Sequence, residues 1–128
     1  MGQVAWELNN MNFSHYTPVK QSWAPPINLF RFPDRYEMYV EIAGVDQSAI
    51  DLVMDAHQMV IRGTRRSFEP DPEKNPCQQM IGMEIQHGRF RRTVQFTEPI
   101  QVEAVVAEQK AGILFIKLPL IHPGSCDE

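Results

Sequence analysis

Hydrophobic and polar residues alternate with a period of two along most of the chain after residue 26. The clearest run covers residues 36–42, where Tyr36, Met38, Val40 and Ile42 alternate with Glu37, Tyr39 and Glu41. Because successive side chains of a strand point to opposite faces, this run predicts a half-buried strand. Similar short runs cover residues 27–32, 50–54, 59–63, 88–96, 102–107 and 112–118. Short strands separated by turn residues predict an all-β fold, an immunoglobulin-like antiparallel β-sandwich.

One stretch of this pattern has an alternative interpretation. Residues 46–61 would also suit a helix capped by Asp46. Two strands are favoured, because the alternation of Ile50, Leu52 and Met54 with polar positions is stricter than any helical stripe in the stretch. Residues 46–49 are expected to form one short helical turn before the first of these strands.

The last predicted strand is apolar on both faces. Leu114, Ile116 and Leu118 share one face, and Ile113 and Phe115 share the other. A strand of this composition needs a cover on each side. The core supplies one cover, and we expect a partner or another segment to supply the second.

The pattern divides the chain into three parts. Residues 1–26 show no steady period, end in two prolines, and are expected to form a flexible arm whose aromatic side chains are Trp6, Phe13, Tyr16 and Trp23. Residues 27–121 form the predicted domain, and residues 122–128 form a short tail. Within the domain, residues 67–82 contain three prolines and predict a long loop, a type that is often functional or exchanged between subunits. Its end, at Gln79, Met80 and Ile81, is compatible with a short edge strand.

Composition narrows the classes of partner. The chain has 128 residues, a net charge of -4 and a pI near 5.5, which disfavours nucleic acid. No apolar run approaches the roughly 20 residues that span a bilayer, so no membrane partner is expected. The start of the chain does not resemble a signal peptide. Cys77 and Cys126 are the only cysteines and are interpreted as free thiols in a reducing cytoplasm, with an intermolecular disulfide as the alternative.

The sequence offers no catalytic constellation. His15, His57, His87 and His122 lack metal-ligand spacing to one another or to a cysteine, so no metal site is predicted. No serine lies in a nucleophile elbow and no glycine loop suits a phosphate. We therefore expect a protein that binds without a cofactor or ATP, and no enzyme.

Four motifs in the same order resemble the small heat-shock protein family, which is built on the alpha-crystallin domain. Residues 36–45 are similar to its strand ending in a Leu-Pro-Gly-Val-like turn, with Ala43 in place of proline. Residues 59–65 resemble the strand that ends Gly-Glu-Arg, and residues 88–92 resemble Gly-x-Phe-x-Arg. The run from Ala107 to Gly112-Ile113-Leu114 is similar to the most specific motif of the family. The resemblance, of bacterial or archaeal type, covers about residues 27–121.

The resemblance implies an ATP-independent holdase that binds partly unfolded proteins as a homodimer or small homo-oligomer. It implies an apolar groove for an extended segment, which we assign to Ile50, Leu52, Met54, Val105, Ala107 and Leu114. The groove could also accept Val4 or Val19 of the arm. The exposed aromatic side chains of the arm, Trp6, Phe13, Tyr16 and Trp23, are expected to bind partly unfolded clients, with packing on their own domain or on a sister subunit as the alternative. It implies a dimer interface, which we assign to Ile27, Leu29, Met80, Ile81 and Arg92, with Met80 and Ile81 pairing with the 27–32 strand of another chain. Arg92 is expected in a structural salt bridge, or else as a snorkelling side chain at the strand edge.

Two alternatives to the holdase stay open: a co-chaperone or adaptor of the CS-domain type, and a structural assembly protein of the same fold. The chain also departs from the family in its tail. The usual Ile-x-Ile motif is missing, since residues 122–128 contain no Ile, Val or Leu. This departure argues against large assemblies locked by tails.

Overall fold

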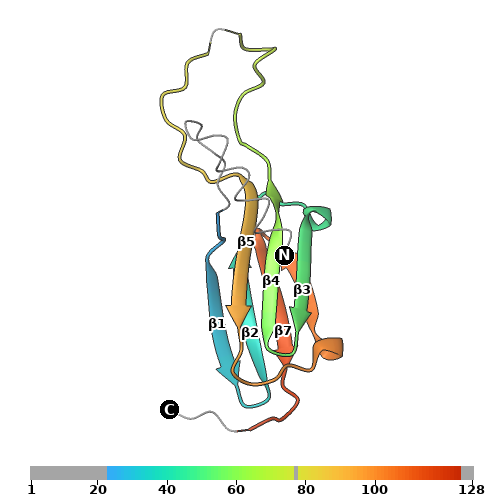
Figure 1. The fold of residues 1–128 in the computed structure, drawn as a ribbon. Helices are drawn as coiled ribbons and strands as arrows, with labels where there is room; N and C mark the ends of the chain where they lie inside the picture. The colour runs from blue at the N-terminus through green and yellow to red at the C-terminus, as the bar shows by residue number, and fades with distance from the viewer. Residues whose placement is uncertain (1–22, 77, 125–128) are drawn as a thin grey trace, which may run out of the picture.

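Strands dominate the structure. The computed structural model describes residues 23–76 and 78–124, and within them the chain forms seven strands and two one-turn 3-10 helices (Figure 1). The strands are β1 (Ile27–Phe32), β2 (Arg35–Glu41), β3 (Ile50–Asp55), β4 (Gln58–Arg65), β5 (Gly88–Gln95), β6 (Val106–Lys110) and β7 (Ile113–Pro119). The helices are η1 (Gln47–Ala49) and η2 (Val102–Ala104). The strand interpretation of residues 50–61 is confirmed, and the helical turn before them is present.

The strands form two antiparallel sheets that pack face to face. One sheet has the order β1-β2-β7-β6 and the other has the order β3-β4-β5. The chain crosses to the second sheet after β2 and returns after β5, which gives the sandwich seen in Figure 1. The predicted all-β sandwich is confirmed.

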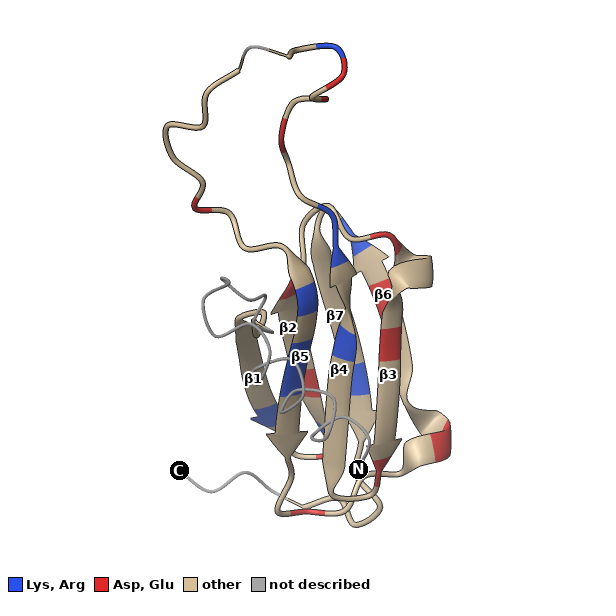
Figure 2. Ribbon diagram, turned by 45° about the horizontal axis from the view of Figure 1, so that its top comes forward, with Lys and Arg blue, Asp and Glu red and all other residues tan. Residues whose placement is uncertain are grey.

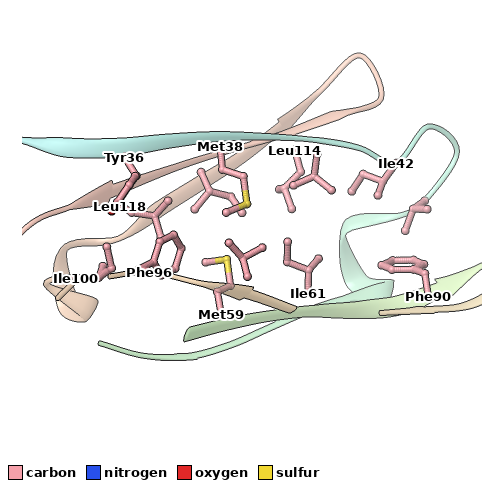
Figure 3. Close-up of a cluster of buried hydrophobic side chains, with 14 of the residues drawn as sticks. Tyr36, Met38, Ile42, Met59, Ile61, Phe90, Phe96, Ile100, Leu114 and Leu118 are labelled. Carbon is pink, nitrogen blue, oxygen red and sulfur yellow. The ribbon is translucent and has the colours of Figure 1, made fainter. Parts of the chain in front are cut away.

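The core lies between the sheets and follows from the alternation. Met38 pairs with Ile116 and Val40 with Leu114 across β2 and β7, and all four side chains point inward and are buried. From the other side of the sandwich Met59, Ile61, Phe90 and Phe96 point toward them (Figure 3), and Val94 belongs to the same buried cluster. Side chains at the intervening positions face outward.

A tight hairpin joins β6 to β7. Ala111 has φ 53° and Gly112 has φ 82°, which are the two positive values that a two-residue hairpin of type I′ requires. A Cβ on Gly112 would lie 3.3 Å from Cα of Ala43, and the Gly112 carbonyl accepts a hydrogen bond from Ile42 N at 2.9 Å. The glycine thus lets this turn approach the end of β2.

Two predicted strands differ in the structure. The strand expected over 102–107 is instead helix η2 followed by β6, which begins at Val106. Ala104 N donates to Gln101 O at 3.0 Å, so the backbone turns here before it joins the sheet. In the described part of the loop, residues 66–76 and 78–87, there is no strand. The loop extends away from the sandwich (Figures 1 and 2), and residues 79–81 pair with no strand among the described residues.

Trp23 is a core residue, which corrects its assignment to an exposed arm. Its backbone lies along the edge of β5, with Trp23 N donating to Arg89 O at 3.2 Å and Trp23 O accepting from Arg91 N at 2.9 Å. Its ring centroid is 5.4 Å from that of Phe90, and the residue is only 8% exposed. Packing therefore begins before residue 27, on the N-terminal side of the two prolines.

Candidate binding site at the open edge of the sandwich

One long side of the sandwich is left open by the two sheets. β3 and β6 are edge strands of different sheets, and they lie on the same side of the molecule (Figures 1 and 2). Each has one neighbouring strand within the described residues, β4 for β3 and β7 for β6. The outer edge of each strand therefore presents backbone N–H and C=O groups without a ladder partner. We call this region the open edge.

The inward-facing side chains at the open edge are apolar and only partly covered. Ile50, Leu52 and Met54 of β3 are half-buried against the core, and so is Val105 just before β6. Ala107 points inward, since it pairs with the buried Ile116, yet it is exposed. An inward-facing residue that stays exposed shows that the opposite sheet does not cover this margin.

Leu114 has a different role from the other predicted groove residues. It lies on β7, one strand further in, and is only 5% exposed. Leu114 therefore supports the open edge from within the core rather than offering surface to a ligand.

Gln109 marks one end of the open edge. Its Nε2 donates a hydrogen bond to Val45 O at 2.7 Å, which joins β6 to the segment before β3.

The arrangement suits an extended apolar segment. Two strand edges supply hydrogen-bonding groups, and alternate apolar side chains supply shallow sites for alternate residues of a ligand strand. The described residues hold no cluster of His, Cys, Asp or Glu that could bind a metal ion. No helix in the described residues is long and apolar enough to cross a membrane.

The residues predicted for a dimer interface lie in separate places in the single chain. Ile27 and Leu29 are on β1, the other edge of the four-stranded sheet; Ile27 packs on the core and Leu29 is exposed. Met80 and Ile81 lie on the projecting loop and are 70% and 86% exposed. The structure does not bring these two pairs together within one chain. Their pairing stays a prediction about two chains.

Arg92 faces inward at the edge of β5. It pairs in register with the buried Ile61 and is half-buried. Its Nη1 donates to Pro25 O at 3.3 Å, and no ion pair of Arg92 is found among the described residues. The predicted salt bridge of Arg92 is therefore not formed within the described part of one chain. Of the remaining predicted residues, Trp6, Phe13, Tyr16, Cys77 and Cys126 lie outside the described residues.

A buried arginine that the sequence did not single out holds the base of the loop. Arg65 ends β4, and its guanidinium donates to Gln86 O at 3.0 and 2.7 Å and to Ala43 O at 3.1 Å. The same group lies 4.4 Å above the Trp23 ring. Arg65 thus joins the two ends of the loop to the end of β2. In the sequence, the sign that Arg65 is buried is its inward-facing position at the end of an alternating strand. Its hydrogen-bond partners could not be predicted, because they are backbone atoms that no sequence pattern identifies.

A second unpredicted network closes the sandwich near the β1–β2 turn. Arg31 forms a two-pronged ion pair with Glu98, with Nε and Nη2 at 2.9 and 2.6 Å from its carboxylate oxygens. Tyr36 donates its hydroxyl to the same carboxylate at 3.2 Å. The Arg31 hydrogen bond lowers the pKa of Glu98, and burial raises the pKa of Tyr36. Arg31 Nη1 also donates to Gly124 O at 2.9 Å, so the start of the tail is held against its own domain.

Comparisons with known proteins agree on one family. The sequence model of the Hsp20/alpha crystallin family matches residues 30–126. The small heat shock protein C2 of Rickettsia felis is 28% identical over 112 residues, which cover 88% of this chain and 70% of the relative. The 17.7 kDa class II heat shock protein of Arabidopsis thaliana is 23% identical, over 90% of this chain and 72% of the relative.

Solved structures of the same family share the fold. The hspA of Xanthomonas axonopodis superposes with a TM-score of 0.68 at 22% identity, covering 81% of this chain and 100% of that one. Heat shock protein 16.0 of Schizosaccharomyces pombe gives a TM-score of 0.66 at 22% identity, covering 84% and 96%. At this level of identity, the likeness establishes the two-sheet architecture and nothing finer.

Proposed function

The chain belongs to the Hsp20/alpha crystallin family, and on that premise we propose that it is an ATP-independent holdase, which binds partly unfolded proteins and prevents their aggregation. The observation that carries the proposal is the open edge, where Ile50, Leu52, Met54 and Ala107 leave apolar surface uncovered between two unpaired strand edges. Unfolded proteins expose both apolar side chains and unpaired backbone groups. Binding such chains removes them from the aggregating pool by mass action and needs no chemical step.

The test compares two neighbouring residues of β3. Leu52 faces the open edge, whereas Val53 faces outward on the other side of the same strand and is 46% exposed. We expect the full chain to suppress heat-induced light scattering of an unrelated, heat-labile protein without ATP. Leu52→Ser should weaken this protection several-fold, because an inserted apolar side chain is worth roughly 1.5–3 kcal/mol. Val53→Ser is the matched control and should retain it.

Other outcomes would separate the alternatives. No protection by the unsubstituted chain would reject the holdase and favour an adaptor that docks folded partners. Concentration-dependent particles without protection would favour a structural assembly protein. Equal protection by Leu52→Ser and the unsubstituted chain would place client binding away from the open edge.

We further propose that the working unit is a homodimer or small homo-oligomer formed by loop exchange. Met80 and Ile81 extend into solvent, and β1, which carries Ile27 and Leu29, has a neighbouring strand on one side only within residues 23–76 and 78–124. Exposed apolar residues on a projecting loop and a free strand edge are complementary. Arg92 lies at the β5 edge, where we propose that an acidic residue of a partner subunit completes its pairing. The low cysteine content supports a cytoplasmic location.

A further inference from the structure

The outer surface of the four-stranded sheet carries an aromatic cluster that no residue in the described part of the chain covers. Tyr39 of β2 lies beside Phe115 of β7, with ring centroids 5.1 Å apart, and beside Phe30 of β1 at 6.1 Å. Phe30 is 52% exposed, and Tyr39 is also exposed. We call Phe30, Tyr39, Ile113 and Phe115 the outer aromatic face.

Aromatic side chains gather on the outward surface of the four-stranded sheet and not on that of the three-stranded sheet. The outward positions of β3, β4 and β5 carry no aromatic side chain: they hold the ion pair of Asp51 with Arg62, at 3.0 Å, and polar residues such as Arg91 and Thr93, with Val53 and Val60 as the apolar exceptions. A polar outward face is what a sheet in contact with water requires. The outer aromatic face, in contrast, leaves the rings of Phe30 and Tyr39 in contact with water, and a cover would bury this surface.

A hollow in the outer aromatic face has room for a ring. It has a volume of about 460 Å³ and is lined by Tyr39, Ile113, Phe115, Ala111, Glu108 and Lys110. Its floor is apolar and aromatic, and its rim carries one acid and one base. This composition suits an aromatic side chain on a segment of low net charge.

We propose that residues 1–22 of the same chain dock on the outer aromatic face and place Phe13 in this hollow. The segment carries Trp6, Phe13 and Tyr16, and Glu7 and Lys20 are its only charged side chains at neutral pH. Aromatic rings gain from contact with one another in edge-on or offset geometry. A tethered segment also meets its site at a high effective concentration, which a separate chain does not.

The point of attachment brings the segment within reach. Trp23 lies three residues before Pro26, whose carbonyl accepts a hydrogen bond from Glu41 N at 3.1 Å. Glu41 is two residues from Tyr39 on the same outward face of β2, next to β7. From strand dimensions, the path from Trp23 to Phe115 is below about 30 Å. Phe13 and Trp23 are ten positions apart, a stretch that spans up to roughly 33–36 Å when extended.

The proposal is independent of client binding, and the experiment is performed without a client. The photo-crosslinking amino acid p-benzoylphenylalanine is placed at position 13 of the full chain, and the crosslinked peptides are identified by mass spectrometry. We expect crosslinks to residues 35–42 and 111–117. In a mixture of isotope-labelled and unlabelled chains, the products should contain no mixed pairs.

Surface substitutions supply the matched comparison. Phe115→Ser should lower the yield of these crosslinks about tenfold, because the aromatic contact is lost. Val53→Ser, on the outer surface of the other sheet, should leave the yield unchanged. A melting curve checks that each variant folds, and Tyr39→Ser replaces Phe115→Ser if the latter does not.

Three results would overturn the proposal. Crosslinks to residues 50–55 or 105–109 would place the segment in the open edge. Mixed-isotope products would show that a second copy covers the face. A yield that Phe115→Ser and Tyr39→Ser leave unchanged would show that the outer aromatic face does not bind the segment.

Discussion

Leu52 and Ile61 are neighbours across the edge strand β3 and the central strand β4 and face the same side of their sheet, but the other sheet covers them to different extents. Ile61 is completely buried beneath the other sheet, whereas Leu52 is half-buried at the open edge. Met59, which is fully buried, and Met54, which is half-buried, repeat the difference at the next inward-facing pair of the two strands. The two sheets of the chain therefore bury the interior residues themselves, whereas the apolar residues of the open edge stay available to a binding partner. This comparison separates residues that fold the protein from residues that are available for binding.

The largest expected effect comes from truncating the interior member of the pair. Ile61→Ala should lower the free energy of unfolding by about 2–5 kcal/mol, because it leaves a cavity between the sheets. Leu52→Ala should cost less than about half as much, since part of its side chain already contacts water. Urea unfolding of both variants measures the difference. Equal losses of unfolding free energy in the two variants would show that Leu52 at the open edge is as well buried as Ile61 in the interior.

A glycine tests how tightly the two strands of this pair are held. A Cβ at Gly63 of β4 would overlap the Ala49 carbonyl oxygen and lie 2.6 Å from Cζ of Phe90. Gly63→Ala should therefore cost about 1–3 kcal/mol of stability through overpacking. Gly82→Ala, on the projecting loop, meets no atom within 4 Å and should change stability by less than about 0.5 kcal/mol. A similar melting temperature for the two variants would contradict the close packing at Gly63.

The same comparison explains what the sequence could and could not predict. Alternation placed Leu52 and Ile61 on one face correctly, because the period of a strand depends only on the backbone. It could not tell which of them the other sheet covers, since that depends on strand order. Trp23 looked like an arm residue for a related reason. Its burial rests on β5 and on the Arg65 guanidinium, which are distant in sequence.

The 102–107 segment shows the other limit of the alternation. Val102 and Ala104 fit a strand pattern, yet the chain turns there through hydrogen bonds between near neighbours, and pairing with β7 starts only at Val106. The strands that form the candidate binding site were predictable, but not which of their residues are exposed. The resemblance pointed to β3 and β6, while Leu114, in the middle of its sheet, belongs to the core.

A smaller effect on stability is expected near the β1–β2 turn, where Arg31 and Glu98 form an ion pair within the chain itself. The hydrogen bond from Arg31 lowers the pKa of Glu98 below its ordinary value of 4.5. A carboxyl with a lowered folded pKa stabilises the fold above its unfolded pKa and loses that contribution as pH falls through the folded value. The stability lost between neutral pH and pH values below 4.5 should therefore be smaller in Glu98→Gln than in the unsubstituted chain. Urea unfolding across this range, with the loop variant Glu84→Gln as control, measures it.

Substitutions in the projecting loop are expected to change the stability of a subunit least. They should instead weaken the association between subunits. Met80 and Ile81 contact little of their own domain, so the double variant Met80→Ser/Ile81→Ser should unfold in urea at the same midpoint as the unsubstituted chain, with both compared at low protein concentration. If these side chains dock on β1 of a second chain, their loss should weaken self-association by about a hundredfold. Sedimentation velocity under reducing conditions measures this, and Gln78→Ser/Gln79→Ser on the same loop is the control. An unchanged sedimentation profile would mean that the dimer forms elsewhere. Because the interior variants change the unfolding midpoint and this variant changes only the association, the two regions are separable by experiment.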